Sequence, residues 1–205
     1  IKNPLGGLRG AAQLLERELP SETLREYTRV IIGEADRLCA LVDSLLGPAR
    51  PVRRERVNVH ELLDRVYRLA RAEAPAGVAI ERDYDPSLPQ LSLDRDLIVQ
   101  AMLNLARNAV QALGASGRLT LRSRALTHAT IGTERHRVVA SLQFEDDGPG
   151  VPIEDWETVF EPYVRVDRAR SRGSGIGLFA ARRLMTAMGG RVWLEANGYG
   201  GSRFV

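Results

Sequence analysis

The chain has 205 residues, of which 44% are hydrophobic and 27% charged, so it is long enough for one or two globular domains. Its single cysteine, Cys39, excludes an internal disulfide and favours a cytoplasmic location, and no stretch is long and apolar enough to predict a membrane span. A net charge of +3 without an aromatic platform or a recognition motif does not support a nucleic acid partner.

Residues 1–46 are predicted to form a helical hairpin. Leu5, Leu8 and Ala12 begin an apolar stripe with helical spacing, and the same spacing resumes after Pro20. A hairpin of this size buries too little apolar surface to be stable alone, so two copies are expected to pair as a homodimeric four-helix bundle. The alternative is that the stripes pack on the rest of the chain.

Residues 47–56 are predicted to be a linker, because Gly47, Pro48 and Pro51 interrupt the helical pattern. Three arginines follow within residues 52–56. A hinge in this segment would let the next domain move toward the hairpin.

Residues 57–205 mix helical and strand periodicity and are predicted to form a second domain. Asp94 is expected to cap a long helix that ends near Leu113. Strands covered on one face by helices form an α/β sandwich, so the fold class of the whole chain is predicted to be α+β. Helices are expected over residues 59–74, 94–113 and 178–188, and strands over 78–84, 117–126, 137–145, 190–195 and 202–205.

Two glycine-rich turns carry the chemistry. Residues 146–150, Asp-Asp-Gly-Pro-Gly, follow a strand, and residues 173–178, Gly-Ser-Gly-Ile-Gly-Leu, open a helix. Glycine backbone approaches phosphate closely, and a helix N-terminus adds free N–H groups. An aspartate on the first turn would accept a hydrogen bond from an exocyclic amine, which predicts a purine nucleoside triphosphate site. Either motif alone could be only a tight turn, and Asp147 competes with Asp146 for the role.

Asn104 and Asn108 add a third element. They are four residues apart and share one face of the predicted helix, beside the apolar stripe that contains Leu105. An amide beside such a stripe is costly unless it is paired, and Mg²⁺ with a triphosphate would satisfy it. The alternative is a pair of solvated surface amides.

In this order the motifs resemble those of the histidine kinase, gyrase, chaperone and MutL ATPase family. Asn104-Leu105 with Asn108-Ala109 resembles its N box, and Asp146 with Gly148-Pro149-Gly150 its G1 box. Phe160-Glu161-Pro162-Tyr163 resembles the F box, and Gly173, Gly175 and Gly177-Leu178 resemble the G2 box. The resemblance covers residues 57 to the end.

The N-terminal residues are similar to histidine kinases of the nitrogen-regulation NtrB type. Ile1-Lys2-Asn3-Pro4-Leu5 resembles the end of the H box His-Glu-Ile-Lys-Asn-Pro-Leu, and residues 6–16 and 26–32 extend the similarity. This alignment puts the phosphoacceptor histidine two positions before Ile1, so the printed chain is not expected to phosphorylate itself. His60, His128 and His136 are expected to be ordinary surface or strand-end residues.

The resemblance implies a role for each matched residue. Asn108 would be the Mg²⁺ ligand, Asp146 would accept from the adenine amine, and Gly148 and Gly150 would let the chain pass beneath the base. Asn104 stands where gyrase-type relatives carry a catalytic glutamate, which favours transfer over hydrolysis. The F-box Phe160 and the G2 residues Gly173, Gly175, Gly177 and Leu178 would complete the ATP site.

The resemblance also implies roles for the segment 164–172 and for Asn3. The segment 164–172 would be a lid over the nucleotide, and at least one of its four arginines, with Arg168 and Arg170 as candidates, would neutralise a phosphate oxygen. Asn3 would orient water for dephosphorylation of a partner aspartate. Its alternative is an ordinary amide on the helix surface.

The resemblance therefore implies a cytoplasmic sensor histidine kinase core that uses ATP and Mg²⁺. Phosphate would pass from ATP to a histidine and then to an NtrC-type response regulator, with a PII-type protein as a further partner. Two other classes of protein remain open: an ATPase of the gyrase or MutL type, and a nucleotide-binding module without catalytic activity.

Overall fold

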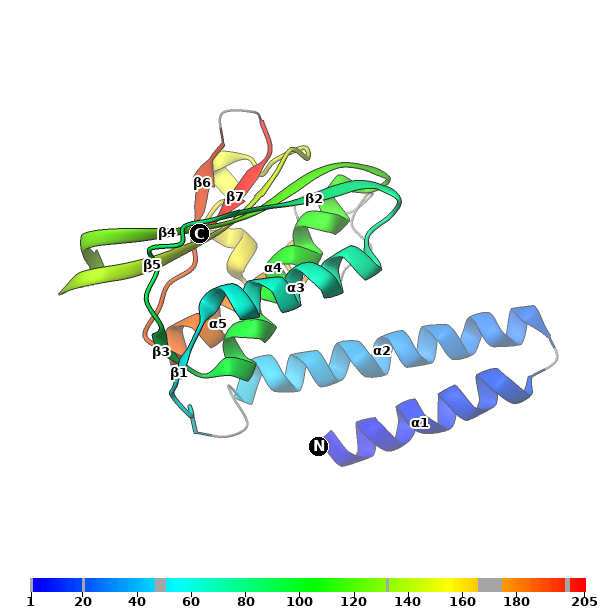
Figure 1. Ribbon diagram of the computed structural model, residues 1–205. Helices are drawn as coiled ribbons and strands as arrows, with labels where there is room; N and C mark the ends of the chain where they lie inside the picture. The colour runs from blue at the N-terminus through cyan, green and yellow to red at the C-terminus, as the bar shows by residue number, and fades with distance from the viewer. Residues whose placement is uncertain (1, 20, 47–50, 132, 166–174, 198–199) are drawn as a thin grey trace. The chain divides into compact units, whose positions relative to one another are not determined.

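The computed structural model describes residues 2–19, 21–46, 51–131, 133–165, 175–197 and 200–205 (Figure 1). They form two compact units, residues 1–49 and residues 50–205.

The first unit is the predicted helical hairpin. It consists of α1 (Lys2–Glu18) and α2 (Glu22–Leu46). An ion pair of 2.9 Å between Arg29 Nε and Glu16 Oε1 joins the two helices. Apolar side chains remain exposed along both helices, namely Leu8, Leu14, Leu15, Leu24, Tyr27, Val30, Ile31 and Leu38. One hairpin therefore leaves much of its apolar stripe exposed.

The second unit is a sheet covered on one face by three helices, as Figure 1 shows. The five strands run in the order β2-β4-β5-β7-β6, with β2 parallel to β4 and the other pairs antiparallel. The elements are β1 (Glu55–Val57), α3 (Val59–Glu73), β2 (Gly77–Tyr84), β3 (Leu91–Leu93), α4 (Arg95–Leu113), β4 (Ser116–Ile131), β5 (Glu134–Asp146), α5 (Gly177–Ala187), β6 (Leu194–Ala196) and β7 (Ser202–Phe204), with 3₁₀ turns at Ile153–Asp155 and Thr158–Phe160.

The core lies between the sheet and its helices. Strand residues alternate, so that Val78 and Ile80 of β2 are buried while Ala79 and Glu81 are exposed. Asp94 caps α4 as predicted, because its side chain accepts a hydrogen bond from Leu97 N. The largest fully buried side chains include Phe144, Phe204, Leu62, Leu63, Ile98, Met102, Leu119 and Leu121.

Three features of the second unit differ from the prediction. β6 covers Leu194–Ala196, whereas a strand was expected over residues 190–195. The hairpin of β4 and β5 stays paired up to Ile131 and Glu134, so His128 and His136 lie in strands rather than beside a loop. A small antiparallel sheet of β1 and β3 was not predicted, because three-residue strands are too short to show a period.

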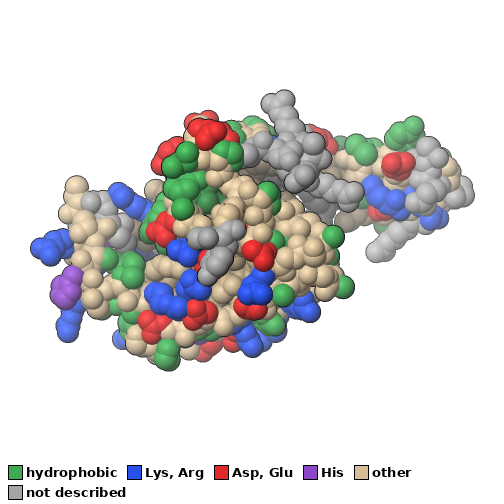
Figure 2. Space-filling model, turned by 90° about the horizontal axis from the view of Figure 1, so that it is seen from above, with side chains coloured by type: hydrophobic (Ala, Val, Ile, Leu, Met, Phe, Trp, Pro, Cys, Tyr) green, Lys and Arg blue, Asp and Glu red, His purple; other side chains and the backbone are tan. Residues whose placement is uncertain are grey.

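The outer face of the sheet carries a row of ion pairs that crosses all five strands. Asp83 of β2 pairs with Arg122 of β4 at 2.8 Å, and Arg122 pairs with Glu145 of β5 at 3.0 Å. Arg203 of β7 continues the row, with 3.2 Å to Glu145 and 3.7 Å to Glu195 of β6. Figure 2 shows basic and acidic side chains interspersed over the face seen from above.

We expect Glu145→Gln to lower the free energy of unfolding of the second unit by about 2 kcal/mol, because two half-buried arginines then lack their shared counter-charge. The Glu145 side chain is only 11% exposed. In the matched control Glu81→Gln, the side chains of the lost Glu81–Arg118 pair are 53% and 60% exposed. That change is expected to cost less than about 0.5 kcal/mol. Urea denaturation followed by the fluorescence of Trp156 and Trp193 measures both, and equal costs would contradict the prediction.

Candidate functional site

Asp146 ends β5 with a buried carboxylate that is only half satisfied. Its Oδ1 accepts hydrogen bonds from the backbone N–H groups of Gly148 at 3.0 Å and Ser202 at 3.4 Å. Its Oδ2 is buried and has no hydrogen-bond partner among the described residues. An unpaired buried carboxylate oxygen is costly, and natural structures keep such groups where an outside donor meets them.

The environment of Asp146 raises the pKa of its carboxyl group. Burial raises the pKa of this carboxyl to about 6, although the two backbone N–H bonds act in the opposite direction. The charges of Asp147 and Glu145 add to the rise. At neutral pH the group is therefore mostly ionised and accepts hydrogen bonds, and it becomes protonated in mildly acidic solution.

Asp147 has a different environment. It is exposed, its Oδ1 accepts the backbone N–H of Arg118 at 2.6 Å, and its own N–H donates to the carbonyl of Arg118 at 3.2 Å. These bonds join the start of β4 to the turn. Asp147 is thus bound to the sheet, whereas the buried carboxylate of Asp146 keeps one oxygen, Oδ2, without a partner among the described residues.

Glycines surround Asp146 at positions that exclude a side chain. A Cβ on Gly148 would lie 2.9 Å from Asp146 Oδ1. Gly150 has a φ of +72°, and a Cβ there would clash with the carbonyl oxygen of Gly200. The turn therefore keeps its backbone close to the chain that precedes β7.

Two supporting residues were not predicted. Asn197 Nδ2 donates to the carbonyl oxygen of Asp146 at 2.7 Å, and a Cβ on Gly201 would clash with that same oxygen. Both lie more than 50 positions after Asp146 in the sequence. The adjacent glycines Gly200-Gly201, directly before the last strand, were the available signal.

α4 connects this turn to the second glycine motif. Asn104 and Asn108 are both half-buried on α4. A Cβ on Gly177 would lie 4.0 Å from the carbonyl oxygen of Asn104, and one on Gly148 would lie 3.6 Å from the backbone of Ala112. The two glycine motifs thus meet α4 at points eight residues apart, which is about 12 Å along a helix. Asn108 lies midway between them.

Arg107, the charged residue of the N-box segment, forms an ion pair with Glu73 of α3. Its Nε and Nη2 donate to the two carboxylate oxygens of Glu73 at 2.8 and 2.6 Å, which ties α4 to α3. The hydrogen bond from Arg107 holds the pKa of Glu73 below its usual range. A cavity of about 310 Å³ adjoins this tie and is lined by Arg65, Asp96, Val99, Gln100, Leu103, Asn104 and Arg107.

The F-box and G2 segments close on each other. Tyr163 N donates to the carbonyl oxygen of Gly175 at 2.8 Å, and both residues have a positive φ, +69° and +70°. Within the described residues no side chain caps the N-terminus of α5, which begins at Gly177. Leu178 is half-buried against the core. Arg168, Arg170 and Gly173 lie outside the described residues, and so does the side chain of Asn3.

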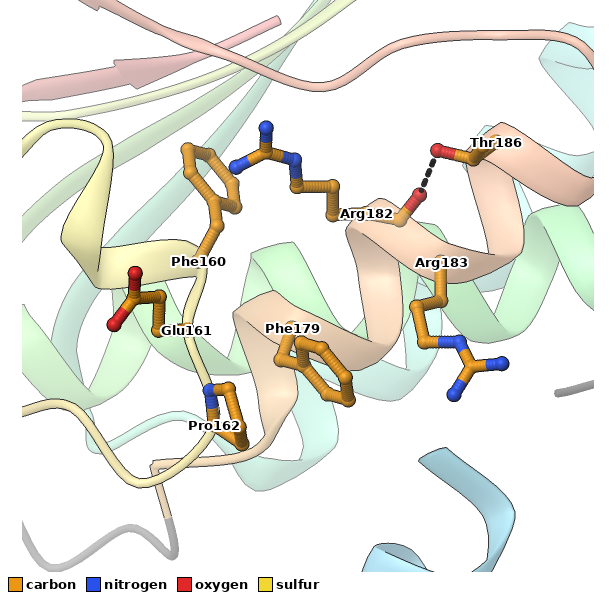
Figure 3. A pocket seen from close by; sticks show the side chains of 7 residues that line it. All are labelled: Phe160, Glu161, Pro162, Phe179, Arg182, Arg183 and Thr186. Atoms are coloured by element: carbon orange, nitrogen blue, oxygen red, sulfur yellow. Dashed lines mark hydrogen bonds between the residues drawn. The ribbon is translucent and has the colours of Figure 1, made fainter. Parts of the chain in front are cut away.

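Phe160 is a core residue of this region. It is buried, its ring meets Phe204 edge-on at 6.2 Å, and the Arg182 guanidinium lies 5.4 Å from its centroid. Figure 3 shows Arg182 reaching over Phe160, whereas Arg183 points away from it on the side of Phe179, whose ring centroid lies 5.8 Å from the Arg183 guanidinium. Phe160 therefore supports the F-box turn from inside. Beside it lies a cavity of about 310 Å³, lined by Phe160, Glu161, Pro162, Phe179, Arg182, Arg183 and Thr186.

A comparison of the sequence with known protein families gives two matches. The family described as histidine kinase-, DNA gyrase B- and HSP90-like ATPases matches residues 93–205, more than half of the chain. The chain belongs to this ATPase family. A second match, to the His Kinase A (phospho-acceptor) domain, covers residues 1–52. No helix among the described residues has the length and apolar character to cross a membrane.

The resemblance to NtrB predicted from the sequence is confirmed. The chain is 46% identical to the sensory histidine kinase/phosphatase NtrB of Vibrio alginolyticus, over 96% of this chain and 56% of that protein. It is 49% identical to the protein of the same name from Escherichia coli O157:H7, over 94% and 54%. The chain thus spans about half the length of the curated relatives that it matches.

Solved structures confirm the predicted α+β fold. Full-length ShkA in complex with AMPPNP superposes with a TM-score of 0.70 and 28% identity, over 99% of this chain and 42% of that one. Histidine kinase ThkA in complex with the response regulator protein TrrA superposes with a TM-score of 0.66, over 98% and 56%. Because ThkA is only 23% identical, it supports the fold alone.

Proposed function

We propose that the chain is the core of a sensor histidine kinase that binds ATP with Mg²⁺ and passes its γ-phosphoryl group to a histidine. One observation carries this proposal. Among the described residues, Oδ2 of Asp146 has no partner and lies in a glycine-lined turn near the C-terminal end of α4. The N-terminus of α5, which no described side chain caps, lies beside Asn104 in the middle of the same helix. This spacing suits a ligand with an amine at one end and phosphates at the other.

Each residue then has a task. Asp146 accepts from the exocyclic amine of adenine, while Gly148 and Gly150 let the base lie against the backbone. Asn108 would offer its amide oxygen to Mg²⁺, which neutralises phosphate charge when bound. The backbone N–H groups of Gly173, Gly175, Gly177 and Leu178 would bind the phosphates. Arg168 or Arg170 would neutralise a phosphate oxygen, and Phe160 supports the F-box turn from the core.

In the proposed reaction the γ-phosphoryl group of ATP is transferred twice, first to a histidine and then to a carboxylate. A ring nitrogen of the acceptor histidine attacks the γ-phosphorus, the bond from that phosphorus to the bridging oxygen breaks, and ADP leaves while the ring loses its N–H proton. A carboxylate of the response regulator then attacks the phosphorus, the phosphorus–nitrogen bond breaks, and the histidine takes up a proton. Asn104, an amide, cannot take a proton from water, which favours transfer over hydrolysis.

The hairpin supplies the other half of the proposal. We assign residues 1–46 to dimerisation and phosphotransfer, 47–56 to the linker and 57–205 to catalysis. The exposed apolar side chains of α1 and α2 support a homodimer, because pairing would bury them. Asn3, one turn after the acceptor position, would orient water during dephosphorylation, in line with the name kinase/phosphatase of the NtrB relatives.

The partners follow from the relatives. The similarity to NtrB supports an NtrC-type response regulator, and the solved complex of ThkA with TrrA is an example of a kinase bound to a regulator. A PII-type protein as the source of the signal and a cytoplasmic location stay predictions from the resemblance.

A labelling experiment tests the transfer. We expect the 205-residue chain and a version with His-Glu placed before Ile1 to bind ATP equally, and only the longer one to take label from γ-labelled ATP. His60, His128 and His136 are not expected to accept phosphate, since His60 is half-buried in a stack on Tyr84 and bonded to Ser123, and the other two lie in paired strands.

An Ala-Glu extension is the matched control and should stay unlabelled. Labelling of the 205-residue chain would contradict the assigned acceptor position. Release of inorganic phosphate by every version, without label on any of them, would indicate a hydrolysing ATPase instead.

A further inference from the structure

The segment 52–57 is attached at several points to the helices of the nucleotide site. Arg53 N donates to Oδ2 of Asp94 at 2.8 Å. Asp94 is 1% exposed, and its Oδ1 accepts from Leu97 N in the first turn of α4. One buried carboxylate therefore joins the segment to the N-terminus of the helix that carries Asn104 and Asn108.

The next residue reaches the end of the other helix. Arg54 Nη2 donates to the carbonyl oxygen of Met188 at 2.7 Å, directly after α5. The helix ends there with a left-handed Gly189, φ +83°, and a Cβ on that glycine would lie 3.6 Å from Arg54 Nη2. A cation at this place meets the unpaired carbonyls and the negative end of the helix dipole.

Strand pairing fixes the register of both contacts. β1 pairs with β3 so that Glu55 lies opposite Leu93, the residue just before Asp94. Val57 is buried in the core. Residues 52–57 therefore cannot shift without disturbing the N-terminus of α4 or the C-terminus of α5, and these are the two helices that meet where Gly177 lies against Asn104.

We propose that Arg54 is a positioning residue: with Arg53 and Asp94 it clamps the segment that follows the hairpin to α4 and α5, and so sets the phosphate end of the site. This inference rests on the proposed function. Asp146 and its turn are held by Gly148, Asn197 and Ser202 instead. The clamp should therefore affect phosphoryl transfer and leave recognition of the base unchanged.

The test uses the full-length protein with Arg54→Ala, Arg54→Lys and Arg56→Ala. Arg56 lies two residues later, in β1, is exposed, and has no side-chain partner among the described residues. We expect Arg54→Ala to lower kcat for autophosphorylation about tenfold with KM for ATP and Kd for Mg²⁺-free ADP within twofold of the parent. Arg54→Lys keeps a cation at the Met188 carbonyl and should restore most of kcat, and Arg56→Ala should match the parent.

Hydrogen exchange gives a readout that does not depend on activity. Amides in the first turn of α4 and the last turn of α5 should exchange faster in Arg54→Ala than in Arg56→Ala, with the β4 and β5 amides unchanged. A kcat of Arg54→Ala equal to the parent, or an equal loss in ADP affinity, would overturn the clamp. If the parent bound no nucleotide at all, the proposed function would fail, and unchanged exchange in both helices would separately reject the clamp.

Discussion

Asp146→Asn is expected to weaken ATP binding about 100-fold, which corresponds to ~2.7 kcal/mol. Oδ1 of Asp146 is occupied by two backbone N–H groups and Oδ2 has no described partner, so an incoming amine has one acceptor to meet. An Asn side chain fails in either orientation. Its NH₂ group faces the amine of adenine in one and the N–H groups of Gly148 and Ser202 in the other. Calorimetry with a nonhydrolysable ATP analogue measures the loss.

The same variant should also change base preference and pH dependence. Guanine has a carbonyl oxygen where adenine has its amine, so the ratio of ATP to GTP affinity should fall in Asp146→Asn. Burial raises the pKa of Asp146 to about 6, so affinity of the parent should decline as the pH falls through 6, because the protonated carboxyl no longer offers a free acceptor. The variant should show no such decline relative to the parent.

The stability of the nucleotide-free Asp146→Asn variant shows whether Asp146 serves ligand binding or folding. A carboxyl whose folded pKa lies at about 6, above its unfolded value of about 3.9, contributes stability at low pH that is lost as the pH rises through 6. At pH 8 the nucleotide-free Asp146→Asn chain should therefore be at least as stable as the parent, by zero to roughly 2 kcal/mol. Calorimetric unfolding tests this, and a strong destabilisation would show that Asp146 serves the fold and not a ligand.

Asp147→Asn is the control for these experiments. Its side-chain oxygen would still accept the N–H of Arg118, and the residue is exposed. ATP affinity and base preference are expected to stay within about threefold of the parent. If Asp147→Asn lost more affinity than Asp146→Asn, the two roles would have to be exchanged.

Asn108→Ala should abolish the part of ATP affinity that depends on Mg²⁺, a loss of about 30-fold or more. The residue lies on α4 between the points where the two glycine motifs meet that helix, where the phosphates of a bound nucleotide would pass. Removing the amide takes away the one side-chain oxygen we assign to the cation. Affinity measured with EDTA should be nearly unchanged, because the base is held by Asp146.

Asn104→Ala provides the matched control, one turn earlier on the same face of α4. It should keep the Mg²⁺-dependent affinity and lower the rate of phosphoryl transfer. Titrations with and without Mg²⁺ distinguish the two residues. If both variants lost the same amount of ATP affinity in the presence of EDTA, neither amide would hold the cation and both would only support the helix.

The arrangement around Asp146 shows how binding and stability oppose each other in this protein. A buried carboxylate with an open acceptor raises the free energy of the nucleotide-free fold. It is held in place because Asn197 donates to the backbone carbonyl of Asp146, and Gly148 N and Ser202 N donate to its Oδ1. An adenine amine would remove that cost on binding. Nucleotide binding should therefore stabilise the second unit more than the contact area alone suggests.

Local patterns in the sequence determined the hairpin, the long helix capped by Asp94, and the order of the four motifs. These features depend on periodicity and turn chemistry, which neighbouring residues express on their own. Pairings that join distant positions were decided only by the tertiary structure. The choice between Asp146 and Asp147 depends on Arg118 and Ser202, and the clamp joins Arg54 to Met188, 134 positions later. Burial and hydrogen-bond satisfaction arise where these segments meet, so no single stretch of sequence contains them.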